Sequence, residues 1–163
     1  MKPKLYLETT IPGSLAAWPS RDLIRAARQQ ITREWWDTRR SEFELFVSQF
    51  VIREVSAGDP TAAADRLKLL EDIAILELTE EATLLADELL RRVPLPARAG
   101  IDAFHIAMAA VSGMDYLLTW NCTHIANAVL RGGIESVCRD VGHVPPRICT
   151  PEELMGTEYH VAQ

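Results

Sequence analysis

The sequence predicts a three-layer α/β/α fold around a mostly parallel, five-stranded sheet. Short apolar runs rich in β-forming residues recur along the 163-residue chain, and segments with helical spacing of apolar side chains separate them. Parallel strands need crossover connections of this kind, which are right-handed and place helices on both faces of the sheet. No repeat or low-complexity tract divides the chain, so we expect a single domain, with a core over residues 1–156 and a C-terminal tail over residues 157–163.

The first elements are a strand, a loop and a long helix. Residues 5–7 are apolar and precede Glu8, where we expect the strand to end in a loop that contains Pro12 and Gly13. Over residues 22–39, apolar side chains recur at helical spacing with arginines on the opposite face. This pattern predicts an amphipathic helix.

The middle of the chain predicts two more strands. Residues 43–48 form a run of β-forming side chains, and residues 49–55 that follow it predict a short helix. A helix over residues 60–72 and a strand over residues 73–78 come next.

The last part of the chain completes the alternation. Thr79 is a suitable N-cap for a helix that runs to about Arg92, because acidic residues follow it in the first turn. The remaining predicted elements are a helix of small residues opening at residue 100, a strand over 116–119, a helix over 123–141 and a strand over 147–150.

Composition narrows the class of protein. With 48% hydrophobic and 25% charged residues, the chain resembles an ordinary globular protein. The longest apolar stretch, residues 101–118, contains Asp102, His105 and Asp115, so we expect no membrane segment. Three irregularly spaced cysteines and the absence of a signal-peptide pattern favour a cytoplasmic location. The net charge of −6 argues against strong non-specific binding to nucleic acid, although 14 of the 17 basic residues are arginines, which suit phosphate partners.

Polar side chains with oxygen donors lie close to the ends of the predicted strands. Glu8 and Asn121 each follow a buried strand directly, Asp102 opens a helix, and Glu54 comes a few residues after the second strand. Ligands of parallel α/β folds bind beyond the carboxyl ends of the strands, so these side chains can reach one crevice. Converging carboxylates repel one another unless a cation neutralises them, and oxygen ligands favour Mg²⁺ or Mn²⁺ over Zn²⁺. Because such an ion orients phosphate and activates water, the pattern predicts phosphodiester hydrolysis.

Five segments of the chain, in order, resemble the PIN-domain family. They are LYLETT at 5–10, SQFVIREV at 48–55, DAFHIA at 102–107, LLTWNCTHI at 117–125 and ICTPEEL at 148–154. The resemblance covers nearly the whole chain, which looks like the VapC-type toxins and their relatives. It implies a PIN-like parallel sheet, a Mg²⁺ or Mn²⁺ site of three or four acidic residues, and endoribonuclease activity as the toxin of a type II toxin–antitoxin pair. An RNA substrate, a small antitoxin partner and a homodimer are implied as well.

Carried over to this sequence, the acidic positions of the family fall on Glu8, Glu54 and Asp102. We expect these three to bind the metal ion, with Asn121 assisting catalysis at the fourth position. The family more often has Asp at the first position, so Glu8 carries its carboxylate one methylene further from the strand. It commonly has an acidic residue at the fourth, where Asn121 supplies a neutral oxygen. Three carboxylates should hold one ion more readily than two.

Further candidates surround these positions. Asn121, His124 and Asn127 are spaced by three residues, so they could share one side of a helix near the site. We expect His105 to be a hydrogen-bonded packing histidine and Trp120 to pack under the site.

Two other functions compete with the nuclease. Glu8 and Asn121 motivate a catalytically weakened PIN domain that acts as an RNA- or protein-binding module. An unrelated receiver or P-loop domain is disfavoured, because Lys2, Lys4 and Lys68 are the only lysines and none lies in a glycine-rich loop or after a late strand. The arginines of the predicted first helix are either a solvated face or a strip that guides RNA or binds a partner.

Overall fold

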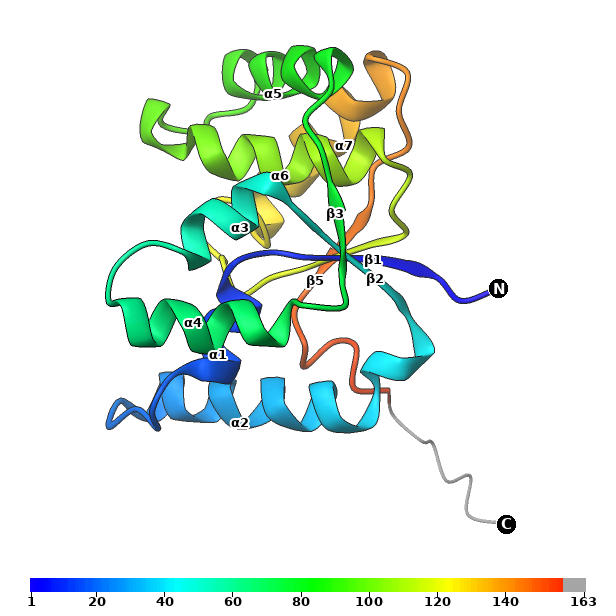
Figure 1. Cartoon of the computed structure of the whole chain (residues 1–163). Coiled ribbons are helices and arrows are strands. Elements are labelled where there is room, and N and C mark those ends of the chain that lie inside the picture. The colour runs from blue at the N-terminus through cyan, green and yellow to red at the C-terminus, as the bar shows by residue number, and fades with distance from the viewer. Residues whose placement is uncertain (157–163) are drawn as a thin grey trace.

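A parallel sheet of five strands runs through the middle of the protein (Figure 1), which is described by a computed structural model over residues 1–156. The strands are β1 (Lys4–Leu7), β2 (Glu44–Ser48), β3 (Ala74–Leu76), β4 (Tyr116–Leu118) and β5 (Arg147–Cys149). Their order is β3-β2-β1-β4-β5, and each neighbouring pair is parallel. The predicted α/β class and parallel sheet are therefore confirmed. The predicted tail over residues 157–163 lies outside the described residues.

Helices cover both faces of the sheet. They are α1 (Thr10–Ala16), α2 (Leu23–Thr38), α3 (Gln49–Val55), α4 (Pro60–Leu69), α5 (Glu80–Arg92), α6 (Gly100–Val111) and α7 (Ala128–Asp140), with 3₁₀ turns at Arg40–Glu42 and Ala97–Ala99. One layer contains α1, α2 and α4, and the other contains α5, α6 and α7 (Figure 1). The short helix α3 contacts both α4 and α6.

Short polar side chains fix where five of the helices begin. Asp22, Ser48, Asp59, Thr79 and Asn127 each accept a hydrogen bond from a backbone N–H in the first turn of the helix that follows. These amides have no partner inside the helix, so the caps supply one. The start of each of these helices is thus encoded locally, which is why the Thr79 cap was predictable from the sequence.

The segment after β1 differs from the prediction. It forms the helix α1 in place of the expected loop. Pro12 is the third residue of α1, where the backbone nitrogen has no carbonyl partner within the helix, so proline does not interrupt it. Gly13 has no positive φ, so it does not act as a turn residue here.

The segment after β4 also differs. The helix predicted over residues 123–141 begins only at Ala128, and the residues between β4 and α7 form turns. The prediction that Asn121, His124 and Asn127 share one side of a helix is therefore wrong. Asn127 caps α7 through a hydrogen bond from the Val129 amide, while Asn121 accepts one from the His124 amide.

The centre of the sheet positions the site. Leu5, Tyr6 and Leu7 of β1 are fully buried, and Leu7 pairs with Leu118 of β4. On the other side of β1, Tyr6 pairs with Phe46 of β2. The carboxyl ends of β1, β2 and β4 therefore meet at one edge of the sheet, so the residues that follow these strands are neighbours.

Two further features bear on the predictions. Within residues 1–156, no helix has the length and apolar character needed to span a membrane. The thiols of Cys138 and Cys149 are buried and that of Cys122 is exposed, and all three are free.

Candidate metal and catalytic site

Glu8 is a buried carboxylate directly after the central strand. It is 3% exposed, and its two oxygens accept hydrogen bonds from the Thr10 amide (3.0 and 3.1 Å), the Thr10 hydroxyl (2.7 Å) and the Thr119 hydroxyl (2.9 Å). Burial raises the pKa of Glu8, while charge interaction with His105 and the hydrogen bonds from both threonines oppose this rise. The protein therefore satisfies this carboxylate from within.

Glu54 is the second predicted acidic residue and lies near the end of α3. Its Oε1 accepts hydrogen bonds from the Thr9 hydroxyl (2.6 Å) and from Nε2 of His105 (2.6 Å). Partial burial acts to raise the pKa of Glu54, but the hydrogen bonds from His105 and Thr9 outweigh it and the pKa is lowered. With its side chain 39% exposed, Glu54 is ionised and open to solvent.

A buried hydrogen-bonded chain lies behind Glu54. Nδ1 of His105 lies 2.6 Å from the Tyr6 hydroxyl, which lies 2.7 Å from the hydroxyl of Ser48. A carboxylate only accepts hydrogen bonds, so Nε2 of His105 donates to Glu54. The Tyr6 hydroxyl shares its other hydrogen bond with the Ser48 hydroxyl. Residues of β1, β2, α3 and α6 are thus joined in the interior.

Asp102 is held by a separate pair of donors. Its Oδ1 accepts a hydrogen bond from Nδ2 of Asn121 at 3.0 Å, and its Oδ2 lies 2.8 Å from Nδ1 of His124. The Asn121 carbonyl oxygen accepts the His124 amide at 3.1 Å, which closes the turn after β4. The side chains of Asp102 and His124 are 22% and 16% exposed, so this group lies at the rim of the site.

Threonines join the parts into one polar network. The Thr119 hydroxyl donates to Glu8 and accepts the backbone N–H of Asn121 at 2.9 Å. After β1, the Thr9 hydroxyl donates a hydrogen bond to Glu54, and the hydroxyl of the next residue, Thr10, donates one to Glu8. The structure thus brings Glu8, Glu54, Asp102 and Asn121 to the carboxyl edge of the sheet.

The chemistry of these donors suits a hard divalent ion, since three carboxylates and an amide supply oxygen ligands. Their arrangement is not that of a closed chelate, however. Within residues 1–156 there is no group of three or more His, Cys, Asp or Glu side chains placed to hold a metal ion. Each carboxylate accepts hydrogen bonds from protein donors: both oxygens of Asp102 are engaged, whereas the two hydrogen bonds described for Glu54 fall on Oε1, so an ion can bind at its Oε2.

Several residues of the network were not predicted from the sequence to contact the acidic side chains. His105 was expected to be a hydrogen-bonded packing residue, which is confirmed, but its bond to Glu54 was not foreseen. His124, Thr10 and Thr119 were also not expected to contact the acidic residues. The DAFHIA segment places Asp102 and His105 three residues apart on one helix face, which is the one signal that could have linked His105 to the site.

The fold and this network define an α/β domain with an acidic site at the carboxyl edge of a parallel sheet. A family model described as the PIN domain matches residues 20–121, which is more than half of the chain. The chain belongs to the PIN-domain family. The matched segment includes Glu54, Asp102 and Asn121, whereas Glu8 lies before it.

Solved structures of VapC systems are similar to this chain. One is VapC20 of Mycobacterium tuberculosis, a toxin described as cleaving the sarcin–ricin loop, with a TM-score of 0.58 and 16% identity, covering 74% of this chain and 92% of that chain. Another is VapBC2 of Rickettsia felis, solved with a DNA fragment from its promoter, with a TM-score of 0.51 and 13% identity, covering 90% of this chain and 97% of that chain. At these identities the likeness establishes the fold. No curated protein matches the chain.

Proposed function

We propose that this PIN domain is a Mg²⁺- or Mn²⁺-dependent endoribonuclease, with Glu8, Glu54 and Asp102 as metal ligands and Asn121 as an assisting residue. One observation carries the proposal. Three carboxylates that are far apart in the sequence belong to one polar network, at the edge of the sheet where α/β folds bind ligands. A bound ion would polarise the scissile phosphate and lower the pKa of an attacking water.

The solvent accessibility of the three carboxylates indicates the order in which they would bind a metal ion. Glu54 and Asp102 have partly exposed side chains, and both hydrogen bonds described for Glu54 fall on Oε1. We expect an ion to meet these two residues first. Glu8 is buried and its Oε2 accepts hydrogen bonds from the Thr10 and Thr119 hydroxyls, so we expect it to bind the ion after the other two.

A ribonuclease assay on purified wild type, Asp102→Asn and Asp37→Asn tests the proposal. Asp37 is an exposed residue of α2 and provides the same amide substitution away from the site. We expect cleavage by wild type and Asp37→Asn only with Mg²⁺ or Mn²⁺, and a loss of roughly 100-fold or more in Asp102→Asn. Equal cleavage by wild type and Asp102→Asn would contradict the assignment.

A second function is favoured by the satisfied state of the carboxylates. Because the described side chains form no ready three-ligand group and Glu8 is buried, a catalytically weakened PIN domain that binds RNA or a protein is the alternative. Titration calorimetry with Mn²⁺ separates the two. RNA binding without any heat of Mn²⁺ binding would favour the binding module.

We also propose a small antitoxin as partner, a homodimer, a cytoplasmic location and one domain over residues 1–163 with its core over 1–156. The likeness of the fold to VapC20 and to VapBC2 supports the toxin–antitoxin interpretation.

An exposed apolar surface lies around the connection between α1 and α2. Its residues Trp18, Leu23 and Ile24 are 91%, 85% and 66% exposed, so a partner could cover them. Toxicity on expression that a neighbouring small protein relieves would support the partner, and light scattering would give the oligomeric state.

A further inference from the structure

A cleft of about 320 Å³ lies between α1, α2 and the end of β4, beside the acidic site. It is lined by Thr10, Gly13, Ser14, Arg25, Arg28, Gln29 and Trp120. The sequence allows two uses for the arginines of α2, a solvated face or a strip that guides RNA or binds a partner. The cleft supports the second use for Arg25 and Arg28.

The cleft is joined to the site by hydrogen bonds. The Thr10 hydroxyl accepts the backbone N–H of Trp120 at 2.8 Å and donates to Oε2 of Glu8 at 2.7 Å. A ligand in the cleft therefore contacts the same threonine that holds the buried carboxylate.

The walls of the cleft carry positive charge and an aromatic ring. The guanidinium carbon of Arg28 lies 5.2 Å from the centroid of the Trp120 ring, and Nε1 of Trp120 donates to the Thr32 hydroxyl at 2.7 Å. These contacts hold the ring and stack the guanidinium on it. Arg25 lies three residues earlier on the same helix and is exposed.

Gln29 fixes the outer end of this wall. It is 9% exposed, its Oε1 accepts the Ser20 amide at 2.9 Å and its Nε2 donates to the Trp18 carbonyl at 3.1 Å. The α1–α2 connection is thus tied to the helix that carries both arginines, so the cleft is a built feature of the fold.

We propose that this cleft binds one nucleotide of single-stranded RNA next to the scissile phosphate, with Arg25 and Arg28 contacting the backbone phosphate and Trp120 contacting the base. The inference rests on the proposed function, in that RNA is the substrate. Arginine forks match phosphate geometry, and aromatic rings accept any base by stacking. The volume lies at the lower end of ligand pockets, which suits one nucleotide rather than a duplex.

Charge favours RNA over an acidic protein segment as the occupant. The protein carries a net charge of −6, and the site itself is acidic, so a polyanion needs local cations to approach Glu54 and Asp102. Arg25 and Arg28 supply them directly beside the network. An acidic peptide would gain from the arginines but has no base to place against Trp120.

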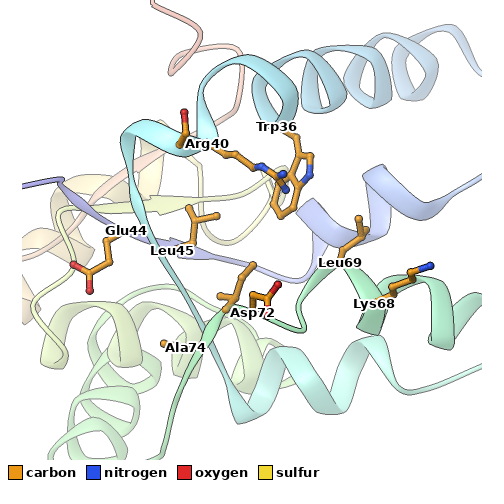
Figure 2. A pocket seen from close by; sticks show the side chains of 10 residues that line it. Trp36, Arg40, Glu44, Leu45, Lys68, Leu69, Asp72 and Ala74 are labelled. Carbon is orange, nitrogen blue, oxygen red and sulfur yellow. The ribbon is translucent and has the colours of Figure 1, made fainter.

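A second arginine–tryptophan pair provides a matched control. Arg40 lies over Trp36 at 4.4 Å in a different cleft of about 480 Å³ (Figure 2). That cleft lies by the amino ends of β2 and β3, where Glu44 and Asp72 also line it. Neutralising Arg40 removes the same charge and the same kind of contact at the opposite edge of the sheet.

The test measures binding without cleavage. A fluorescein-labelled single-stranded RNA of roughly 12 nucleotides and mixed sequence is titrated with wild type, Arg28→Gln, Arg25→Gln/Arg28→Gln and Arg40→Gln in EDTA, and a gel verifies that it stays intact. We expect Arg28→Gln to weaken binding about fivefold and to lower the salt slope by about 0.7, and the double variant to lower it by about 1.4. Arg40→Gln should bind like wild type.

A steric variant checks the location independently of charge. A Cβ built on Gly13 of α1, or on Gly132 of α7, meets no atom within 4 Å, so a side chain at either position starts in open space. Gly13→Leu fills the cleft and should weaken RNA binding about tenfold, whereas Gly132→Leu should leave it unchanged. Circular dichroism on both variants establishes that they are folded.

The outcomes separate this inference from the proposed reaction. Equal RNA affinity in wild type and Arg28→Gln, equal losses in Arg28→Gln and Arg40→Gln, or no RNA binding by wild type would each overturn it. The same titration is repeated with a labelled poly-glutamate peptide. If the cleft variants weaken binding of this peptide but not of RNA, the cleft belongs to an acidic protein partner and the inference is overturned. If the cleft variants lose RNA binding but wild type shows no metal-dependent cleavage, the nucleotide site stands and the nuclease proposal fails.

Discussion

Nε2 of His105 lies 2.6 Å from Oε1 of Glu54, so a histidine that is 1% exposed holds a carboxylate that is 39% exposed. The imidazole is also bonded to the Tyr6 hydroxyl, which places it between the central strand and the site. The orientation of Glu54 is therefore set from the protein interior. A half-exposed residue of α3 is thus oriented by a buried, hydrogen-bonded partner.

Replacing His105 tests this relationship. His105→Ala leaves the Tyr6 hydroxyl and Glu54 without their shared partner and opens a cavity, so we expect the free energy of unfolding to fall by about 2–4 kcal/mol. Urea denaturation followed by circular dichroism measures the loss. His143→Ala, at a half-buried position near β5, serves as the control and should change stability by less than about 1 kcal/mol. Similar losses in both variants would contradict the bridging role.

The buried carboxylate of Glu8 should make stability depend on pH. Burial raises its pKa above the ordinary value of 4.5, so the folded protein binds this proton more tightly than the unfolded chain. The contribution of Glu8 to the free energy of unfolding is therefore fully present below pH 4.5 and is lost as the pH rises through the raised pKa. Glu8→Gln removes the titration, so wild type should gain stability relative to this variant as pH falls from 7 towards 4.5.

Urea denaturation of both proteins at several pH values measures this difference. Glu54, whose pKa is lowered, titrates in the opposite sense but is present in both proteins and cancels. Glu34→Gln, an exposed substitution on α2, should show no such trend. A stability difference between wild type and Glu8→Gln that does not change with pH would show that burial does not raise the pKa of Glu8.

Restoring an acidic residue at position 121 should strengthen metal binding. Nδ2 of Asn121 donates to Asp102, so Asn121→Asp places a second carboxylate against the first. Like charges at this distance destabilise the metal-free protein, and a divalent cation relieves the repulsion. We expect a lower melting temperature without metal and a larger rise with Mn²⁺ than wild type shows.

Thermal unfolding with and without Mn²⁺ checks this prediction. Asn127→Asp is the matched control, because Asp also caps helices and residue 127 contacts the amide of Val129 rather than an acidic residue. A rise with Mn²⁺ that is the same in Asn121→Asp and in wild type would count against a metal site at Asp102.

The three free thiols should react at different rates. Burial raises the pKa of Cys138 to about 11 and that of Cys149 to about 12, and only the thiolate is reactive. Cys122 is exposed. At pH 7.5 a maleimide should label one thiol of the folded protein quickly and all three in urea, as mass spectrometry would record. Cys122→Ser should abolish the fast reaction, and fast labelling of two thiols would contradict the packing of β5 or α7.

Local chemistry made much of the fold predictable. Periodic apolar residues marked α2, and short polar caps such as Thr79 marked where helices begin. The predicted elements were wrong where a local sequence pattern is compatible with two structures. Pro12 and Gly13 predicted a loop, although proline fits the first turn of α1, and the segment after β4 was extended into a helix that Asn127 starts later.

The sequence by itself determined the class of fold, since strand ends and helix starts depend on residues close together in the chain, while the metal-binding roles of Glu8, Glu54 and Asp102 stay a prediction. Only the tertiary structure decided how those carboxylates are held. Glu54 meets His105 across 51 residues and Glu8 meets Thr119 across 111 residues, and no periodicity encodes such pairings. They arise because β1, β2 and β4 are adjacent in the sheet, and this adjacency fixes which donors reach each carboxylate.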